Sequence, residues 1–154
     1  MAERLTAQDV FGFLRPDQVN TISETSERIS FAPGEVVYEM GTQAHHFYTV
    51  LAGEITLRLP GKSGVSIVID QLGTGDMFGT CVCLDHPVYS LTAQCSKASE
   101  ILKIKSAVLK DLMDKDLMMG YALQTRISKV YFERYVETMQ KLQAIVMNIP
   151  IVTH

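Results

Sequence analysis

Hydrophobic positions change their spacing twice along this chain. In residues 1–25 the apolar side chains recur at helical spacing, and Pro16 opens a second short helix. From residue 26 to residue 105 the period becomes that of short strands, with glycines at the turns. Residues 106–149 return to helical spacing. We therefore expect N-terminal helices, a β region and C-terminal helices within one unit.

The β region consists of short alternating segments with no helix between them. Ile55, Leu57 and Leu59 are predicted to face the core, whereas Thr56 and Arg58 face solvent. Many short strands at such spacing indicate an antiparallel sandwich or barrel. The predicted strands are Arg28–Phe31, Val36–Glu39, His46–Leu51, Glu54–Leu59, Val65–Gln71, Ser90–Cys95 and Ile101–Lys105.

Two helices are predicted after the strands. The first spans Ser106–Met113, and the second, much longer, spans about Asp116–Asn148. Pro150 ends it, because proline cannot continue a helix. The chain stops six residues after Asn148, which leaves no room for a DNA-recognition helix within this sequence.

Composition narrows the possible functions. The chain has 154 residues, of which 47% are hydrophobic, and this suits a single domain spanning residues 1–154. A formal net charge of −3 argues against nucleic-acid binding. With neither a signal-peptide core nor a membrane-length apolar run, we expect a soluble, cytoplasmic protein that does not bind membranes. Enzyme motifs for dinucleotides, phosphates, zinc or a nucleophilic serine are missing from the sequence, so we expect no enzyme.

The segment 75–93 has the layout of a phosphate cradle, in which a glycine turn leads into a short helical start and then a strand. It follows three other glycine-containing motifs, Phe31-Ala-Pro-Gly-Glu, Tyr38-Glu-Met-Gly and Phe47-Tyr-Thr-Val-Leu-Ala-Gly-Glu-Ile, and itself begins Gly75-Asp-Met-Phe-Gly. In this order, with a long helix after them, the motifs resemble the cyclic nucleotide-binding domain. That family includes catabolite-activator (Crp/Fnr-like) regulators, regulatory subunits of protein kinase A and gated ion channels.

The resemblance implies a mainly β fold with flanking helices, an eight-stranded jelly roll or double-stranded β-helix. It also implies a cassette that binds the cyclic phosphate and ribose, and a C-terminal helix that covers the pocket or dimerises. Carried onto this sequence, the degenerate cassette comprises Phe78, Gly79, Thr80, Cys81, Val82, Tyr89 and Ser90.

Two charged residues of the family's cassette are absent here. Thr80 stands where the family has a ribose-binding glutamate, and Tyr89 stands where it has a phosphate-binding arginine. Losing two hydrogen bonds to charged groups would weaken binding by roughly 3 to 6 kcal/mol, about two to four decades of affinity. Lysine and arginine are absent between Asp76 and Ser96. A cyclic nucleotide is therefore possible but disfavoured, and no cofactor is expected.

Several interpretations of the cassette remain possible. Tyr89 either fills the volume of the missing arginine and phosphate or contacts a different, neutral or aromatic ligand. A distant arginine such as Arg126 could fold over the pocket. Cys81, Cys83, His86 and Cys95 could together form a thiol or metal sensor, although their spacing matches no known metal pattern and no metal is expected.

The last helix carries an apolar seam. Two adjacent apolar stripes are wider than the face that a helix needs to pack on its own domain, so they indicate a partner helix and a homodimer. The alternative is that both stripes are buried against the chain's own strands. The predicted dimer-interface residues are Tyr131, Tyr135, Thr138, Leu142 and Ile145, and the second stripe contains Phe132, Val136, Met139 and Val146.

Three functions follow from the sequence. The first is a sensory or regulatory module, dimeric, with weak or altered ligand specificity. The second is a ligand-free pseudo-receptor that serves as a scaffold for dimerisation or for binding an unknown protein partner. The third is a thiol or metal sensor.

Overall fold

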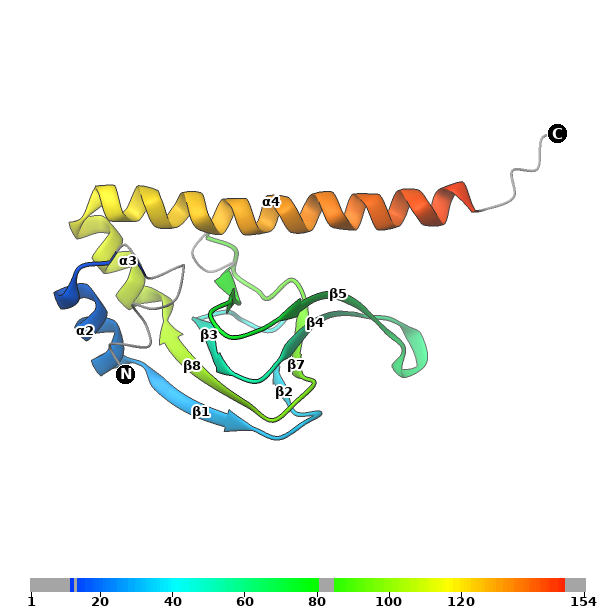
Figure 1. Ribbon diagram of the computed structural model, residues 1–154, viewed down its shortest axis with the longest axis horizontal. Helices are drawn as coiled ribbons and strands as arrows, with labels where there is room; N and C mark the ends of the chain where they lie inside the picture. The colour runs from blue at the N-terminus through cyan, green and yellow to red at the C-terminus, as the bar shows by residue number, and fades with distance from the viewer. Residues whose placement is uncertain (1–11, 13, 81–84, 149–154) are drawn as a thin grey trace.

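The β region folds into two four-stranded antiparallel sheets that face one another (Figure 1). The computed structural model describes residue 12 and residues 14–80 and 85–148. One sheet has the order β1 (Glu27–Phe31), β8 (Ser99–Lys105), β3 (His46–Ala52) and β6 (Met77–Phe78). The other has the order β2 (Val36–Tyr38), β7 (Thr92–Cys95), β4 (Ile55–Pro60) and β5 (Ser66–Leu72). The predicted mainly β jelly roll is confirmed.

Seven of these strands correspond to predicted ones, with bounds that differ by one or two residues. The described chain adds β6, which has only two residues and is therefore too short to show alternation. Thr92–Cys95 is shorter than predicted at its start, because Ser90 and Leu91 lie before the strand. The predicted helix after Thr6 lies outside the described residues.

The core lies between the two sheets. Its largest fully buried side chains include Phe47, Phe78 and Ile55. β3 is buried along nearly its whole length, because it runs between β8 and β6 in its sheet. At the following turn, Gly53 has a φ of +94°, and a Cβ there would lie 2.3 Å from the Ser99 hydroxyl oxygen. Only glycine fits this turn without displacing β8.

The β4–β5 hairpin departs from the simple alternation. Ile55 and Leu57 are buried as predicted, but Leu59 is 40% exposed because the hairpin extends past the roll (Figure 1). Thr56 was expected to face solvent and is instead buried, with its hydroxyl donating to the Gln94 carbonyl oxygen at 3.2 Å. Arg58 is half-buried.

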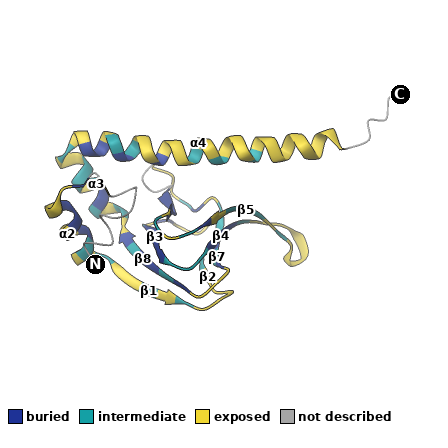
Figure 2. Cartoon of the chain, viewed as in Figure 1, coloured by how far each residue is buried: buried dark blue, intermediate teal, exposed yellow. Residues whose placement is uncertain are grey.

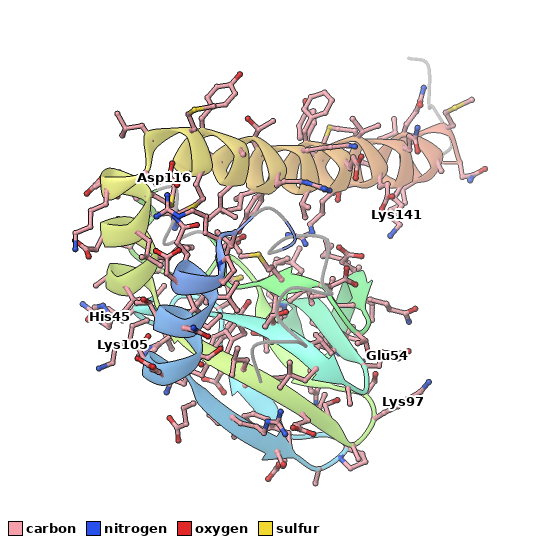
Figure 3. All side chains as sticks on the ribbon, turned by 60° about the vertical axis from the view of Figure 1, so that its left-hand side comes forward. His45, Glu54, Lys97, Lys105, Asp116 and Lys141 are labelled. Carbon is pink, nitrogen blue, oxygen red and sulfur yellow. The ribbon has the colours of Figure 1, made fainter. Side chains whose placement is uncertain are left out.

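Helices α2 (Pro16–Thr25) and α3 (Ser106–Lys115) lie at one end of the roll, and α4 (Leu117–Met147) runs across it and continues beyond (Figure 1). Asp116, at the junction of α3 and α4 (Figure 3), caps α4 by accepting a hydrogen bond from the Met119 amide at 3.1 Å. Most of α4 is exposed, and its buried residues lie in the first half of the helix (Figure 2). In the described ranges, the helices are too short or too polar to cross a membrane.

Candidate functional site

The cassette begins where β6 meets the Gly79 turn. Phe78 is buried in the core, and Gly79 has a φ of +70°. A Cβ at Gly79 would lie 3.2 Å from ring carbons of both Tyr48 and Tyr89. Glycine is therefore required by both the backbone angle and the rings that close over it. Cys81 and Val82, which the resemblance assigns to the cassette, lie outside the described residues.

Four aromatic side chains fill the space beside Gly79. They form the aromatic cluster, which consists of Tyr38, Tyr48, Phe78 and Tyr89. The rings of Tyr38 and Tyr89 stack with centroids 3.7 Å apart and planes only 12° from parallel. Tyr48 stacks on Phe78 at 5.1 Å. Such contacts stabilise beyond the area they bury, by about 0.5 to 1.5 kcal/mol per pair.

Tyr89 is the centre of this cluster. It is only 4% exposed, and its hydroxyl donates a 2.7 Å hydrogen bond to the main-chain oxygen of His46 on β3. Burial raises the pKa of Tyr48, and a hydrogen bond with Tyr89 offsets part of that rise. The Tyr48 hydroxyl is thus held neutral, and neither tyrosine supplies the positive charge that an anionic ligand needs.

The cavity left beside the cluster is very small. It is lined by residues that include Gly79, Tyr89 and Ser90 and has a volume of about 10 Å³. That is the space of one water molecule at most. Ser90 is exposed at the rim. The space between these described residues has no room for a phosphate with its ribose.

Helix α4 closes the cavity from the other side. Thr80 is buried, and its hydroxyl donates a 3.2 Å hydrogen bond to the Tyr131 hydroxyl. Arg134, one turn further along α4, lines the same cavity. Its Nε is 3.1 Å from an Asp70 carboxylate oxygen, and its guanidinium carbon is 5.3 Å from the centre of the Tyr131 ring. The guanidinium that lines this cavity is therefore paired with Asp70.

Sequence reasoning missed Arg134 and considered Arg126 instead. Arg126 lines a second pocket of about 260 Å³ between α4 and strands β5 and β6, which we call the helix pocket and which Arg134 also lines. Arg134 stands three residues after Tyr131, so helical spacing could have put both on one face. The ion pair with Asp70 on β5, however, joins residues that the sequence keeps far apart.

The helix pocket is strongly charged. It contains two guanidinium groups and four carboxyl groups, so acidic groups outnumber basic ones. Its apolar wall includes Leu72, Met77 and Ile127. An anionic ligand would meet net repulsion there, whereas a neutral or positively charged one would not. The lining residues are Asp70, Gln71, Leu72, Asp76, Met77, Thr80, Arg126, Ile127, Val130, Glu133, Arg134 and Glu137.

The thiol or metal sensor considered as a minor alternative would draw on Cys81, Cys83, His86 and Cys95. Cys81 and Cys83 lie outside the described residues. Cys95 is buried, and burial raises the pKa of its thiol. The exposed His86 has its Nδ1 2.7 Å from the Val88 carbonyl oxygen. Over residues 14–80 and 85–148, His, Cys, Asp and Glu side chains form no group of three that could hold a metal ion.

The predicted dimer-interface residues divide into two sets. Tyr135, Leu142 and Ile145 are 50% to 59% exposed. Tyr131 and Thr138 are half-buried, and Tyr131 packs on the chain's own core. One helix face thus carries the contacts with the roll, and a different face carries the exposed apolar residues.

Solved structures similar to this one share its fold. A protein of Geobacter metallireducens described as cyclic nucleotide-binding is 23% identical with a TM-score of 0.73, covering 87% of this chain and 97% of its own. The sensor domain of the transcriptional regulator DNR from Pseudomonas aeruginosa is 19% identical with a TM-score of 0.74, covering 88% and 96%. The catabolite activator protein of Thermus thermophilus is 21% identical with a TM-score of 0.70, covering 85% and 62%.

Identity below 25% supports the fold alone, so the family rests on the sequence. No curated protein matches the chain. The model of the cyclic nucleotide-binding domain, however, matches residues 28–116, which is more than half of the 154 residues. That range contains both sheets except the first residue of β1, and it contains the whole cassette. This chain belongs to the cyclic nucleotide-binding domain family.

Proposed function

We propose that this chain is a dimeric regulatory module whose cassette does not respond to cyclic nucleotides. The observation that carries the proposal is the stacked pair of Tyr38 and Tyr89. Tyr89 stands where the resemblance implies a phosphate-binding arginine, and the Tyr38 ring lies directly against it. The pair is held in place by the hydrogen bond from Tyr89 to His46. A ligand would have to displace buried rings before it could make any contact.

Charge supports the same conclusion. Thr80 and Tyr89 replace the two charged residues of the family, and Arg134 is already paired with Asp70. A cyclic phosphate that recruited Arg134 would have to break this ion pair and leave a carboxylate without its partner, which is costly for a partly buried charge. The cassette is therefore filled and neutralised by the chain's own side chains, and among the described residues no unpaired positive charge lines it to attract an anion.

The dimer is proposed through the outward face of α4. From Phe132 to Val146, exposed apolar residues follow a three-four spacing along this face, as in the seam of a coiled coil. Met118 and Tyr121 continue the same register nearer the start of the helix, and the seam residues are 39% to 85% exposed. The exposure values favour a seam shifted from the predicted one, because Tyr131 and Thr138 are half-buried while Phe132 and Met139 are exposed. The proposed seam contains Met118, Tyr121, Phe132, Tyr135, Met139, Leu142 and Val146.

A second function, sensing of a different small molecule, is favoured by the helix pocket. Its volume of about 260 Å³ is close to the lower end of ligand sites, roughly 300 Å³. It touches both the cassette, through Thr80, and α4, through Arg134. A neutral or cationic ligand there would act on the contact between the roll and the helix.

A thermal-shift screen tests the proposed function. With cAMP or cGMP at 1 mM we expect no change in Tm, whereas a ligand at 100 times its Kd would stabilise the fold by about 2.7 kcal/mol. A rise in Tm with either cyclic nucleotide would overturn the proposal. A rise only with neutral or cationic compounds, abolished by Asp76→Asn, would favour the second function.

A further inference from the structure

Arg58 lies on the outer face of the sheet formed by β2, β7, β4 and β5. Its register partners are Thr92 on β7 and Val68 on β5. Leu57, the residue before it, is only 2% exposed and belongs to the core. Because side chains alternate along a strand, Arg58 points away from the core and from the aromatic cluster.

The Arg58 side chain is held in one orientation. Its Nε donates to the Thr56 hydroxyl at 3.0 Å, and its Nη1 donates to the Ser66 hydroxyl at 3.1 Å. Both partners are neutral and lie on β4 and β5, so the sheet itself fixes the guanidinium. A guanidinium has five N–H donors. These two bonds leave N–H groups of Nη1 and Nη2 on the outer edge of the guanidinium. This two-pronged edge can donate two parallel hydrogen bonds.

The charge of Arg58 is not balanced by a carboxylate in the way that the charges of Arg15, Arg28 and Arg134 are. Arg28 has Glu100 at 2.6 Å and Arg134 has Asp70 at 3.1 Å. Arg15 contacts two carboxylates. Across the portions of the chain that the structure describes, no carboxylate lies within ion-pair distance of Arg58. A half-buried, oriented guanidinium without an acidic partner is an arrangement suited to receiving an anion.

The guanidinium opens into a pocket of about 360 Å³ on this face. Thr92, Gln94 and Ser66 provide polar groups around it, and Met40 and Pro60 provide apolar ones. From this arrangement we infer that the Arg58 pocket binds a small organic acid through its carboxylate group. The free edge of the guanidinium pairs with the two carboxylate oxygens, and the apolar groups contact the short carbon chain.

The lining of the pocket carries no net formal charge. Arg58 contributes one positive charge, and Glu39, which lines the same pocket, contributes one negative charge. A phosphate dianion would double both the attraction to Arg58 and the repulsion from Glu39, so its extra charge gains little here. The apolar Met40 and Pro60 favour a carboxylate with a short carbon chain, which can contact them. This inference concerns the face of the sheet opposite the aromatic cluster and does not depend on the proposed function of the cassette.

Titration of the full chain with sodium propionate, followed by ¹H–¹⁵N NMR at constant ionic strength, tests the inference. We expect saturable shifts of the Arg58 Nε–H signal and of the Ser66, Thr92 and Gln94 amides, with a Kd of about 1 to 10 mM. Arg58→Gln should abolish saturation. Arg58→Lys, which keeps the charge but loses the two-pronged edge, should weaken binding about tenfold. Glu39→Gln should strengthen binding.

Lys62→Gln is the matched control, because Lys62 lies in the turn of the same hairpin but does not line the pocket. It should leave the Kd unchanged. Linear shifts without saturation in the native chain, or an equal loss in Lys62→Gln, would overturn the inference in favour of diffuse surface charge. Tighter binding of phosphate than of propionate would overturn the choice of a carboxylate. Saturation or its absence in the native chain tests the inference even if an Arg58 variant unfolds.

Discussion

Thr80 in the cassette and Tyr131 on α4 are joined by a hydrogen bond of 3.2 Å between their hydroxyl groups. Thr80 occupies the position where the resemblance implies a glutamate that grips the ligand. The cassette therefore contacts the chain's own helix at that position. A contact of this kind holds α4 against the roll through the chain's own side chains, and it supports the proposal that cyclic nucleotides do not set the position of the helix.

The Tyr89 side chain should contribute to stability in two separable ways. Tyr89→Phe removes the hydrogen bond to His46 and should lower the free energy of unfolding by about 0.5 to 1.5 kcal/mol. Tyr89→Ala also leaves a cavity beside Tyr38 and should cost about 3 to 5 kcal/mol, as large aromatic truncations do. Urea unfolding measures both values. Val65→Ala, at a side chain that is 64% exposed, should change stability by less than about 0.5 kcal/mol.

Restoring the family's charges should not by itself restore binding. The double variant Thr80→Glu with Tyr89→Arg supplies both charged groups, but the Tyr38 ring still lies in the space beside them. Adding Tyr38→Ala should open that space. We expect cAMP to bind the triple variant at least about tenfold more tightly than the double variant, a difference of 1.4 kcal/mol, in calorimetric titrations.

Tyr38→Ala alone is the control for the triple variant, and it should bind no cAMP because it lacks both charges. Equal binding by the double and triple variants would show that Tyr38 is not the obstacle. Circular dichroism of each variant separates loss of the fold from loss of the site, since Arg at position 89 would be buried in the native packing.

The glycine motifs made the fold predictable, because each marks a turn whose backbone few other residues can adopt. Gly79, with its φ of +70°, shows this directly. The loss of charge at Thr80 and Tyr89 could also be read from the sequence. The sequence does not predict which side chain packs against Tyr89 in the cassette. Tyr38 lies on β2, about fifty residues before Tyr89 in the sequence. The two rings meet because β2 pairs with β7, the strand that begins shortly after Tyr89.

The face of α4 was harder to predict for a related reason. Two adjacent apolar stripes on a helix do not reveal which one meets the roll. The hydrogen bond from Thr80 to Tyr131 and that from Arg134 to Asp70 show which stripe meets the roll, and both depend on how the helix crosses the sheets. Spacing alone therefore grouped the half-buried Tyr131 with the exposed Tyr135.

The proposed dimer seam gives a test of that face. Phe132→Asp with Leu142→Asp removes two apolar side chains, each contributing about 1.5 to 3 kcal/mol when buried, and should shift a dimer to monomer. Sedimentation equilibrium measures the mass. Gln140→Asp introduces charge beside the seam and should leave the dimer intact. Dissociation caused instead by Thr138→Asp would favour the originally predicted seam, and a monomeric native chain would remove the dimer from the proposal.

Cys95 should be protected from alkylation. It is 1% exposed, and burial raises the pKa of its thiol from the ordinary value of 9.0, so little thiolate is present at pH 8. We expect iodoacetamide to label Cys95 at least about tenfold more slowly in the native chain than in urea. Mass spectrometry of the peptide that contains Cys95 measures this rate. Equal rates in both conditions would show that the strand β7 opens readily or that the thiol is activated.

The Asp116 carboxylate should make stability depend on acid. Its hydrogen bond from the Met119 amide, followed by that from the Gln18 side chain at 3.0 Å, lowers its pKa below the ordinary value of 3.8. Because the folded state binds the proton less tightly than the unfolded state, this contribution is complete above pH 3.8 and is lost as pH falls through the folded-state pKa. Asp116→Asn should therefore lower Tm at pH 7, and the difference from the native chain should shrink below about pH 3.5. Asp111→Asn, at an exposed pair with Lys115, is the control and should change Tm little at pH 7. A difference between Asp116→Asn and the native chain that stays constant down to pH 2 would mean that the side chain acts through its shape rather than its charge.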